Sequence, residues 1–176
     1  EVKLQLKSKD VNKLVNEVVN RCADLAKKKS IHVILELEPL FSIKMDEDLI
    51  RQVLMNLLEN AIKYSPDNSK ILITTEELDG QAVIQVADQG VGIDQDDLPN
   101  IFDKFYRARD VKDSEVKGSG LGLYLAQYFV QLHRGHIYAE SEPGKGSTFT
   151  VELPMDLEFT NVLEQQGERY GESPRR

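Results

Sequence analysis

The sequence predicts an α/β (α+β) fold, a two-layer sandwich in which a mixed, mostly antiparallel sheet carries three main helices on one face. Three segments carry apolar residues in the pattern of helices, and shorter segments of alternating apolar and polar residues lie between and after them. Four of these alternating segments form two consecutive pairs, each joined through a glycine-containing turn, as in antiparallel hairpins. Elements with a single apolar face bury it by packing together in layers.

The first part of the chain is expected to form a strand, a helix and another strand. Residues 2–6 alternate apolar and polar side chains, which is the period of a strand with one wet face. Asp10 is a candidate N-cap for an amphipathic helix over residues 11–26, and three lysines follow at the negative end of its dipole. Residues 31–37 alternate again and predict a second strand.

The middle of the chain predicts a helix followed by a hairpin. The helix begins near Asp46 and carries a buried apolar stripe as far as the Ser-Pro-Asp-Asn turn at residues 65–68. Residues 70–75 and 82–87 then read as two strands that are joined through the turn at residues 78–80.

The stretch of residues 95–117 fits neither pattern, because it is polar apart from a small aromatic cluster. An irregular segment of this length in a compact domain is usually functional, so we expect a mobile lid over a ligand. Gly118 is expected to start a third helix that runs to about His133, and residues 136–141 and 147–153 predict the last two strands.

The composition indicates one acidic globular domain. The 176 residues suit a single domain over residues 1–155 and a flexible polar tail over residues 156–176. A net charge of −8 argues against a nucleic-acid-binding surface. Cys22 is the only cysteine and no apolar run reaches membrane-spanning length, so we expect a cytoplasmic location and no membrane contact by this fragment. A chain that begins at Glu1 without Met is expected to be a fragment of a longer protein.

Two amides and a lysine share one face of the second expected helix. Asn56, Asn60 and Lys63 are spaced at i, i+4 and i+7, opposite the apolar stripe. Asn is a poor helix former, and amide oxygens suit Mg²⁺ that also binds substrate phosphates, against which Lys63 would add a positive charge. A merely solvated helix face is the alternative, and it stays open on this segment alone.

A carboxylate stands at the expected end of a strand, directly before two glycines. Asp88 can accept a hydrogen bond from an exocyclic amine such as that of adenine. Gly90 and Gly92 allow the backbone to pass close to a flat ring. Asp and Gly are also common in ordinary tight turns, so taken alone this segment favours a turn.

Three glycines, Gly118, Gly120 and Gly122, lie at the expected start of the third helix. Free N–H groups and the helix dipole favour anions there. The glycine spacing differs from the dinucleotide-binding fingerprint. His133 and His136 lie three residues apart, but no third ligand is near them, so a metal site is not expected there.

Read together, these segments resemble the catalytic ATP-binding domain of sensor histidine kinases, the enzymes of two-component signalling. The family's N box, first glycine box, F box, second glycine box and third glycine box correspond in order to residues 56–65, 88–93, 101–107, 118–123 and 144–148. The match runs from about residue 8 to residue 154, and its specificity comes from the combination and spacing of the boxes.

The resemblance implies a fold related to the ATP-binding domains of DNA gyrase and MutL, with ATP and Mg²⁺ as ligands. Asn60 would coordinate Mg²⁺ with support from Asn56. Lys63 and Arg107 would face the phosphates, so that Asn60, Lys63 and Arg107 are the implied catalytic residues. Tyr64 would pack near the sugar and the base.

The resemblance also implies how the base and the lid are held. Asp88 would bind the adenine amino group, with Thr148 joining through water. Phe102 and Phe105 would anchor the lid and help dock the partner domain. The other residues implied to bind the nucleotide are Gly90, Gly92, Ile93, Phe105, Gly118, Ser119, Gly120, Leu121, Gly122 and Leu123.

The phosphoacceptor histidine of the family lies on a dimerisation helix hairpin that precedes this domain. His32, His133 and His136 are not in such a setting, so the chain is expected to be half of an enzyme. Its expected partners are that hairpin of its own protein and, through the full-length kinase, a response regulator; nucleic acid is not expected.

Two classes remain open beside a histidine kinase: an ATP-hydrolysing clamp of the gyrase type and an inert nucleotide-binding module. The clamp enzymes carry a Glu four residues before the metal-binding Asn, where it polarises water. Asn56 occupies that position here, and Glu59 points about 100° away around the helix. The sequence therefore favours a kinase over a clamp, while the full set of polar residues argues against an inert module.

Overall fold

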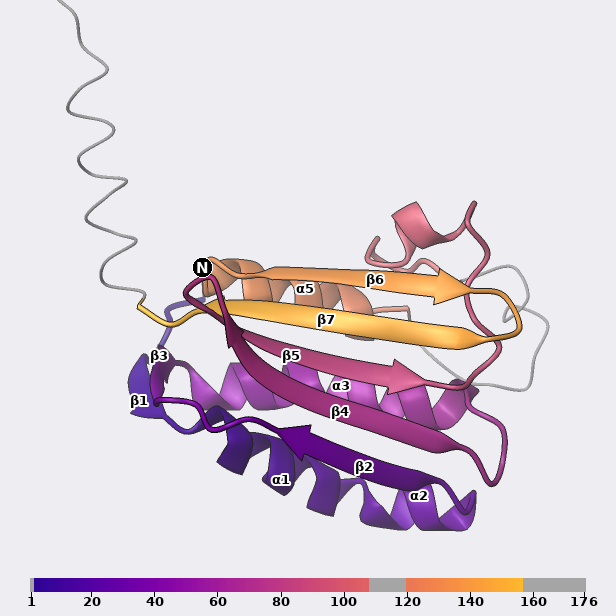
Figure 1. Ribbon diagram of the computed structural model, residues 1–176. Coiled ribbons are helices and arrows are strands. Elements are labelled where there is room, and N and C mark those ends of the chain that lie inside the picture. Colours follow the sequence, from indigo (N-terminus) through magenta and orange to yellow (C-terminus); the bar gives the residue numbers. More distant parts are fainter. Residues whose placement is uncertain (1, 108–119, 157–176) are drawn as a thin grey trace, which may run out of the picture.

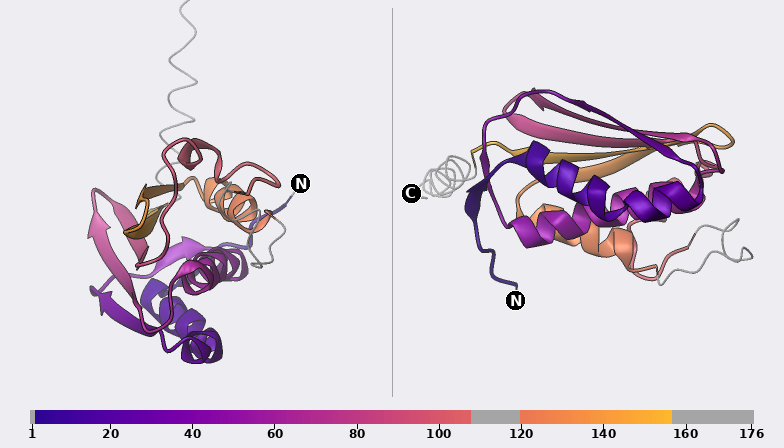
Figure 2. Two further views of the ribbon diagram at one scale, coloured as in Figure 1. Left: turned by 90° about the vertical axis from the view of Figure 1, so that its right-hand side faces the viewer. Right: turned by 90° about the horizontal axis from the view of Figure 1, so that it is seen from below.

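The computed structural model describes residues 2–107 and 120–156. Its main sheet has five strands in the order β2-β4-β5-β7-β6, and the helices cover one face of it (Figures 1 and 2). β2 pairs with β4 in parallel, and the other three pairs are antiparallel. The two-layer sandwich with a mixed, mostly antiparallel sheet is confirmed.

The first and the central helix begin at the N-cap residues that the sequence indicates. α1 (Val11–Arg21) starts at Asp10, whose side chain accepts a hydrogen bond from the N–H of Lys13. The expected first helix is divided at Cys22, after which α2 (Ala23–Lys28) begins. α3 (Glu47–Tyr64) starts at Asp46 and is the long central helix. α5 (Gly122–Leu132) begins later than expected, and residues 118 and 119 lie outside the described part.

The predicted strand over residues 2–6 is wrong. The first strand is β1 (Lys7–Lys9), which pairs with an unpredicted strand, β3 (Ile43–Met45), in a separate two-stranded sheet. The N–H of Gln5 instead donates to Oδ2 of Asp46 at 2.9 Å. A side chain thus takes the hydrogen bond that a neighbouring strand would otherwise accept.

The strands of the main sheet lie where the alternating patterns predict them, and several are longer than expected. Their bounds are β2 (His32–Leu37), β4 (Lys70–Leu78), β5 (Gln81–Asp88), β6 (His136–Glu142) and β7 (Gly146–Pro154). Within the stretch predicted to be a lid, the structure describes residues 95–107, which include the 3₁₀ helix η1 (Leu98–Asn100). The rest of the predicted lid and nearly all of the predicted tail lie outside the described residues.

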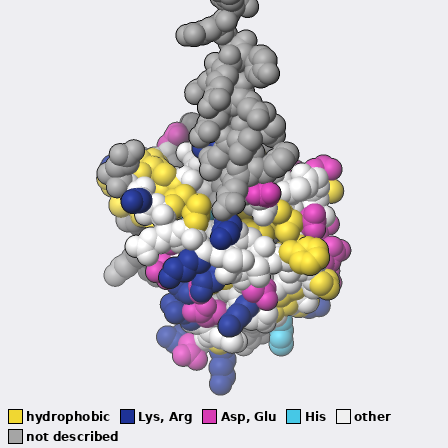
Figure 3. Space-filling view, turned by 90° about the vertical axis from the view of Figure 1, so that its left-hand side faces the viewer, with side chains coloured by type: hydrophobic (Ala, Val, Ile, Leu, Met, Phe, Trp, Pro, Cys, Tyr) yellow, Lys and Arg dark blue, Asp and Glu magenta, His cyan; other side chains and the backbone are white. Residues whose placement is uncertain are grey.

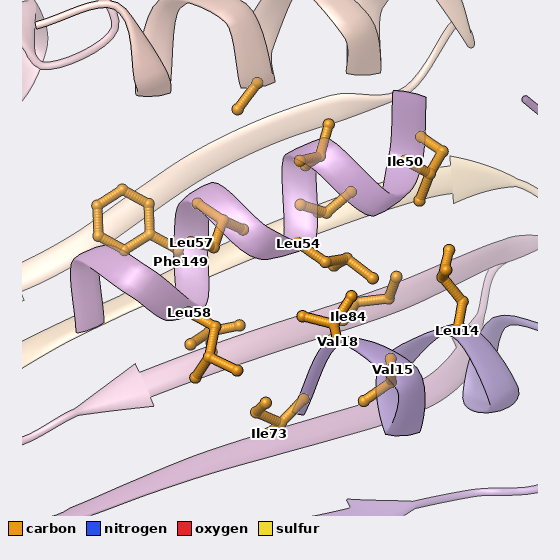
Figure 4. Packing of buried hydrophobic residues seen from close by; sticks show 14 of the residues in the cluster. Leu14, Val15, Val18, Ile50, Leu54, Leu57, Leu58, Ile73, Ile84 and Phe149 are labelled. Atoms are coloured by element: carbon orange, nitrogen blue, oxygen red, sulfur yellow. The ribbon is translucent and has the colours of Figure 1, made fainter. Parts of the chain in front are cut away.

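The core lies between the helices and the sheet. Figure 4 shows side chains of α1 and α3 meeting those of the strands: Leu14, Val15, Val18, Ile50, Leu54, Leu57, Leu58, Ile73, Ile84 and Phe149. Burial of such side chains is the main source of stability, at about 1.5–3 kcal/mol for each. Because the apolar side of α3 packs against β5 and the neighbouring helices, its polar face is fixed in position as well.

Charged side chains tie the start of α3 to its surroundings. Arg51 donates to Glu17 at 3.1 Å, Glu47 at 2.8 Å and Asp48 at 2.6 Å, and Lys9 pairs with Glu47 at 2.7 Å. At this end of the molecule, Lys and Arg lie next to Asp and Glu on the surface (Figure 3). Ion pairs among partly exposed groups contribute little each, so this network orients the helices more than it stabilises them.

Candidate functional site

A cavity of about 240 Å³ opens between the second half of α3, the segment after β5 and the start of α5. Its lining includes Asn60, Lys63 and Tyr64 of α3, and Asp88 at the end of β5. Arg107 lies on the same cavity. Residues from three of the sequence segments singled out above are therefore gathered around one space.

The polar face of α3 is covered rather than solvated. Asn56 is half-buried, and its Nδ2 donates to the carbonyl oxygen of Gly122 at 3.0 Å. This bond fixes the start of α5 beside α3, while Asn56 itself does not line the cavity. One turn further on, Asn60 does line it, and no hydrogen bond from its side chain to the described residues is present. The amide of Asn60 is thus available to a ligand.

Two cations face the cavity together. The pKa of Lys63 is lowered by burial and then by the positive charge of Arg107, with Glu59 acting in the opposite direction. Bringing two like charges together is unfavourable, and an anionic ligand between them relieves the repulsion. This wall of the cavity is suited to phosphate groups.

Asp88 adds a hydrogen-bond acceptor to the lining of the same cavity. Its Oδ1 accepts from the backbone N–H of Gly90 at 2.8 Å and of Ser147 at 3.2 Å. Burial raises the pKa of this carboxyl, and the two N–H groups oppose that rise. Within the described part of the chain Oδ2 has no hydrogen-bond donor, so it remains free to accept from a ligand.

Two glycines let the chain pass tightly behind Asp88. A Cβ on Gly90 would lie 2.7 Å from the carbonyl oxygen of Tyr64. Gly92 has φ +73, and a Cβ there would lie 2.2 Å from the carbonyl oxygen of Glu142. Both positions exclude a side chain, because the backbone of another segment lies against them. The approach of this backbone to a flat ring stays a prediction.

Thr148 does not lie where the resemblance implied. In the β5–β7 ladder, Ser147 pairs with Asp88 and Thr148 pairs with Ala87. Because side chains alternate across a strand, Ser147 shares the helix-facing side with Asp88, while Thr148 is on the other face of the sheet. Ser147 lines the cavity and Thr148 does not. The pairing register between β5 and β7 decides which of the two residues lies beside Asp88, and the sequence does not give that register.

The three aromatic residues between residues 102 and 106 have different positions relative to the cavity. Phe102 packs edge-on against Phe149, with ring centroids 6.3 Å apart, as expected of an anchor. Phe105 is 64% exposed and does not line the cavity, although its N–H donates to the carbonyl oxygen of Gly120 at 3.0 Å. Tyr106, which the sequence reading missed, lines the cavity and donates through its hydroxyl to Asp97.

The remaining expected residues fall around the start of α5. Gly92, Ile93, Gly120, Gly122 and Leu123 line the cavity. Leu121 acts through its backbone, since its carbonyl oxygen accepts from the N–H of Leu125 at 2.9 Å. Gly118 and Ser119 lie outside the described residues. Cavity residues that the sequence reading missed are Ala61, Val91, Ile101, Tyr106, Ser147 and Phe149.

His133 has a structural role. It is 1% exposed; its Nε2 accepts from the N–H of Asp46 at 2.9 Å, and its Nδ1 lies 2.7 Å from the carbonyl oxygen of Phe129. Nδ1 therefore carries the proton, and burial lowers the pKa of the ring. Among the described residues there is no cluster of three or more His, Cys, Asp or Glu side chains that could hold a metal ion.

This arrangement defines a nucleotide-binding domain, with one cationic wall, one acceptor wall and a glycine-rich approach to a helix. A family model described as histidine kinase-, DNA gyrase B-, and HSP90-like ATPase matches residues 45–157. The chain belongs to this family. In the described residues no helix combines the length and the apolar character needed to cross a membrane.

Its relatives in sequence are sensor histidine kinases. The chain is 34% identical over 145 residues to the sensor-like histidine kinase SenX3 of Mycolicibacterium smegmatis. It is 41% identical over 118 residues to the sensor histidine kinase WalK of Bacillus subtilis. These matches cover 82% and 66% of this chain, but only 38% and 19% of the relatives.

Solved structures of histidine kinases share the fold. The catalytic domain of the histidine kinase ThkA has a TM-score of 0.77 and 28% identity, with 88% of this chain and 98% of that one covered. Full-length ShkA in complex with AMPPNP also has a TM-score of 0.77, with 29% identity over 87% of this chain and 32% of that one. ThkA in complex with the response regulator TrrA has a TM-score of 0.74 and 27% identity, covering 88% of this chain and 43% of that one. The chain is an ATP-binding catalytic domain of the histidine kinase type.

Proposed function

We propose that this domain binds Mg²⁺-ATP and transfers its γ-phosphoryl group to a histidine on a dimerisation helix hairpin outside this chain. The observation that carries the proposal is the placement of Asn60, Lys63 and Arg107 on the same cavity as Asp88. One wall offers an amide oxygen and two cations to a triphosphate and its metal, and the other offers an acceptor to the adenine amine.

Each group has a defined task in this proposal. Asp88 accepts from the amino group of adenine, and Tyr64 packs near the sugar and the base. Lys63 and Arg107 neutralise the phosphates as charge moves onto the leaving oxygen. Asn60 supplies an oxygen ligand for Mg²⁺, which would neutralise phosphate charge when bound. A bond forms between the acceptor imidazole nitrogen and the γ-phosphorus as the bond to the β–γ bridging oxygen breaks, and ADP leaves.

An ATP-hydrolysing clamp is less consistent with the site. Hydrolysis needs a base that positions water, and the position where clamp enzymes carry that Glu is Asn56. The Asn56 side chain donates to Gly122 and lies outside the cavity lining, and Glu59 is exposed. The kinase needs no such base, because its nucleophile is an imidazole supplied by another domain.

The proposal extends to partners and location. A response regulator is the proposed receiver of the phosphoryl group, supported by the ThkA–TrrA complex of a related kinase. A reducing cytoplasm is the proposed location, supported by the single buried Cys22. Both proposals concern the complete kinase rather than this domain alone.

The test adds the phosphoacceptor helix hairpin to this domain. The chain is mixed with the upstream helix hairpin of its own protein and with γ-labelled ATP and Mg²⁺, and acid-labile label on the hairpin is measured. Asn60→Ala is expected to abolish labelling, whereas Asn16→Ala, an exposed Asn on α1, is expected to leave it unchanged. Rapid ATP hydrolysis by the chain alone would favour the clamp, and ATP binding without labelling of the hairpin would favour an inert module.

A further inference from the structure

The hydroxyl of Ser141, near the end of β6, makes three hydrogen bonds that join two walls of the cavity. It accepts from the backbone N–H of Ile93 at 2.7 Å and lies 2.9 Å from the carbonyl oxygen of Gly146. Its third partner is the hydroxyl oxygen of Ser147, at 2.8 Å. Ile93 and Ser147 line the cavity, while Ser141 lies behind them.

The protons in this network can be assigned by counting. A serine hydroxyl has one proton and two acceptor sites. The Gly146 carbonyl only accepts, so the Ser141 proton is directed to it, and the Ile93 N–H occupies one acceptor site of Ser141. The contact with Ser147 then requires the proton of the Ser147 hydroxyl. That proton points away from the cavity, toward Ser141.

The Ser147 hydroxyl and the Asp88 carboxylate therefore form a subsite that accepts hydrogen bonds and donates none. The Ser147 oxygen has free lone pairs, and beside it lies the Asp88 carboxylate, which is bonded to the Ser147 N–H at 3.2 Å. Neither group offers a proton to a ligand in this arrangement. A purine with an amine at position 6 donates to such a pair, whereas a purine with a carbonyl oxygen there presents a third acceptor.

We infer that Ser141 is a positioning residue that sets the base selectivity of the nucleotide site, by holding the Ser147 hydroxyl as an acceptor toward the cavity. The inference rests on the proposed binding of adenine at Asp88. Ser141 itself does not touch the nucleotide, and it selects for 6-amino purines through Ser147.

The test compares the dissociation constants of ATP and inosine triphosphate, which carries a carbonyl oxygen at position 6. The wild-type chain is expected to prefer ATP. In Ser141→Ala the Ser147 hydroxyl can turn and donate to that oxygen, so the preference should fall about five- to tenfold, the effect of one neutral hydrogen bond. Ser141→Thr keeps a hydroxyl in place and should keep the preference.

Three controls separate this role from a general loss of structure. In a Ser147→Ala background no hydroxyl remains to turn, so adding Ser141→Ala should leave the ATP-to-inosine-triphosphate ratio unchanged. Ser8→Ala removes an exposed hydroxyl on β1 and should change neither affinity. Ser141→Cys, which preserves the side-chain volume with a weak donor, replaces Ser141→Ala if thermal melting shows that the latter is unfolded.

Equal weakening of both nucleotides by Ser141→Ala would show a purely structural role and overturn the inference. A change of the ratio in the Ser147→Ala background would overturn it as well. If the wild-type chain binds both nucleotides with equal affinity, there is no base preference for Ser141 to set, and the inference is overturned together with the proposed adenine site. Binding of neither nucleotide would contradict the proposed function itself.

Discussion

The ammonium group of Lys29 lies 2.5 Å from the carbonyl oxygen of Ser65, the C-cap residue of α3. The same group lies 2.8 Å from the carbonyl oxygen of Ile62 and 3.2 Å from that of Lys63. The last carbonyls of a helix have no partner within the helix, and a cation there also favours the helix dipole. Lys29 therefore caps the turn of α3 that carries Lys63 and Tyr64 to the cavity.

Replacing Lys29 by Met should loosen that turn. We expect the free energy of unfolding to fall by about 1–3 kcal/mol, because the carbonyl groups lose a charged partner. The affinity for ATP should fall several-fold as well, since Lys63 and Tyr64 are no longer held. Lys28→Met, an exposed neighbour at the same helix end, is the matched control for loss of one charge. Denaturant unfolding and ATP titration measure the two effects; equal behaviour of the two variants would exclude the capping role.

Removing the carboxylate of Asp88 should weaken ATP binding by about 1–3 kcal/mol, the effect of leaving a buried amine without a partner. GTP, which lacks that amine, should lose much less affinity. Titration calorimetry with both nucleotides measures the difference in wild type and Asp88→Ala. Asp24→Ala changes an exposed carboxylate on α2 and is expected to leave both affinities unchanged. Unaltered ATP affinity in Asp88→Ala would remove the base site from this cavity.

Ser147 and Thr148 provide a direct test of strand register. Ser147→Ala should reduce ATP affinity by about 0.5–1.5 kcal/mol, the net contribution of one hydrogen bond. Thr148→Ala, which deletes a hydroxyl on the other face of the same strand, should change it by less than that. ATP titration of the two variants under the same conditions shows which hydroxyl contributes to binding. A larger loss of affinity in Thr148→Ala would support Thr148, the residue that the family resemblance implies.

His133 should make stability depend on pH. Its ordinary pKa is 6.5 and burial lowers it in the folded protein, so the unfolded chain takes up the proton first as the pH falls. The contribution of the neutral ring is therefore present above pH 6.5 and is lost as the pH drops below 6.5 toward the lower folded pKa. Urea unfolding at several pH values should show a flatter profile for His133→Gln than for wild type.

The matched control for this prediction is His136→Gln, at an exposed position on β6. This variant removes one histidine ring from the surface and so controls for the loss of a histidine as such. His133→Gln should also be less stable above pH 7 by about 1–3 kcal/mol, because the buried N–H of Asp46 loses its acceptor. Parallel profiles for wild type and His133→Gln would contradict the assignment of a neutral buried ring.

The sequence by itself determined the fold class, the long central helix and most of the sheet. Periodicity is a local property, and it is strong where one face of an element is buried, as along α3. The cap at Asp10 was likewise visible, because it depends on residues three apart. Several residues that line the cavity, among them Asn60, Lys63 and Asp88, could be singled out for the same reason, since each lies in a short segment with its own pattern.

The tertiary structure decided what depends on distant partners. Alternation gives two faces to β7, but only pairing with β5 places Ser147 rather than Thr148 beside Asp88. Residues 2–6 have the period of a strand, yet Gln5 bonds to the side chain of Asp46, 41 residues away. The acceptor for the N–H of Asp46 is a ring 87 residues further along the chain. Such partners leave no trace in a local pattern, because folding alone brings their atoms together.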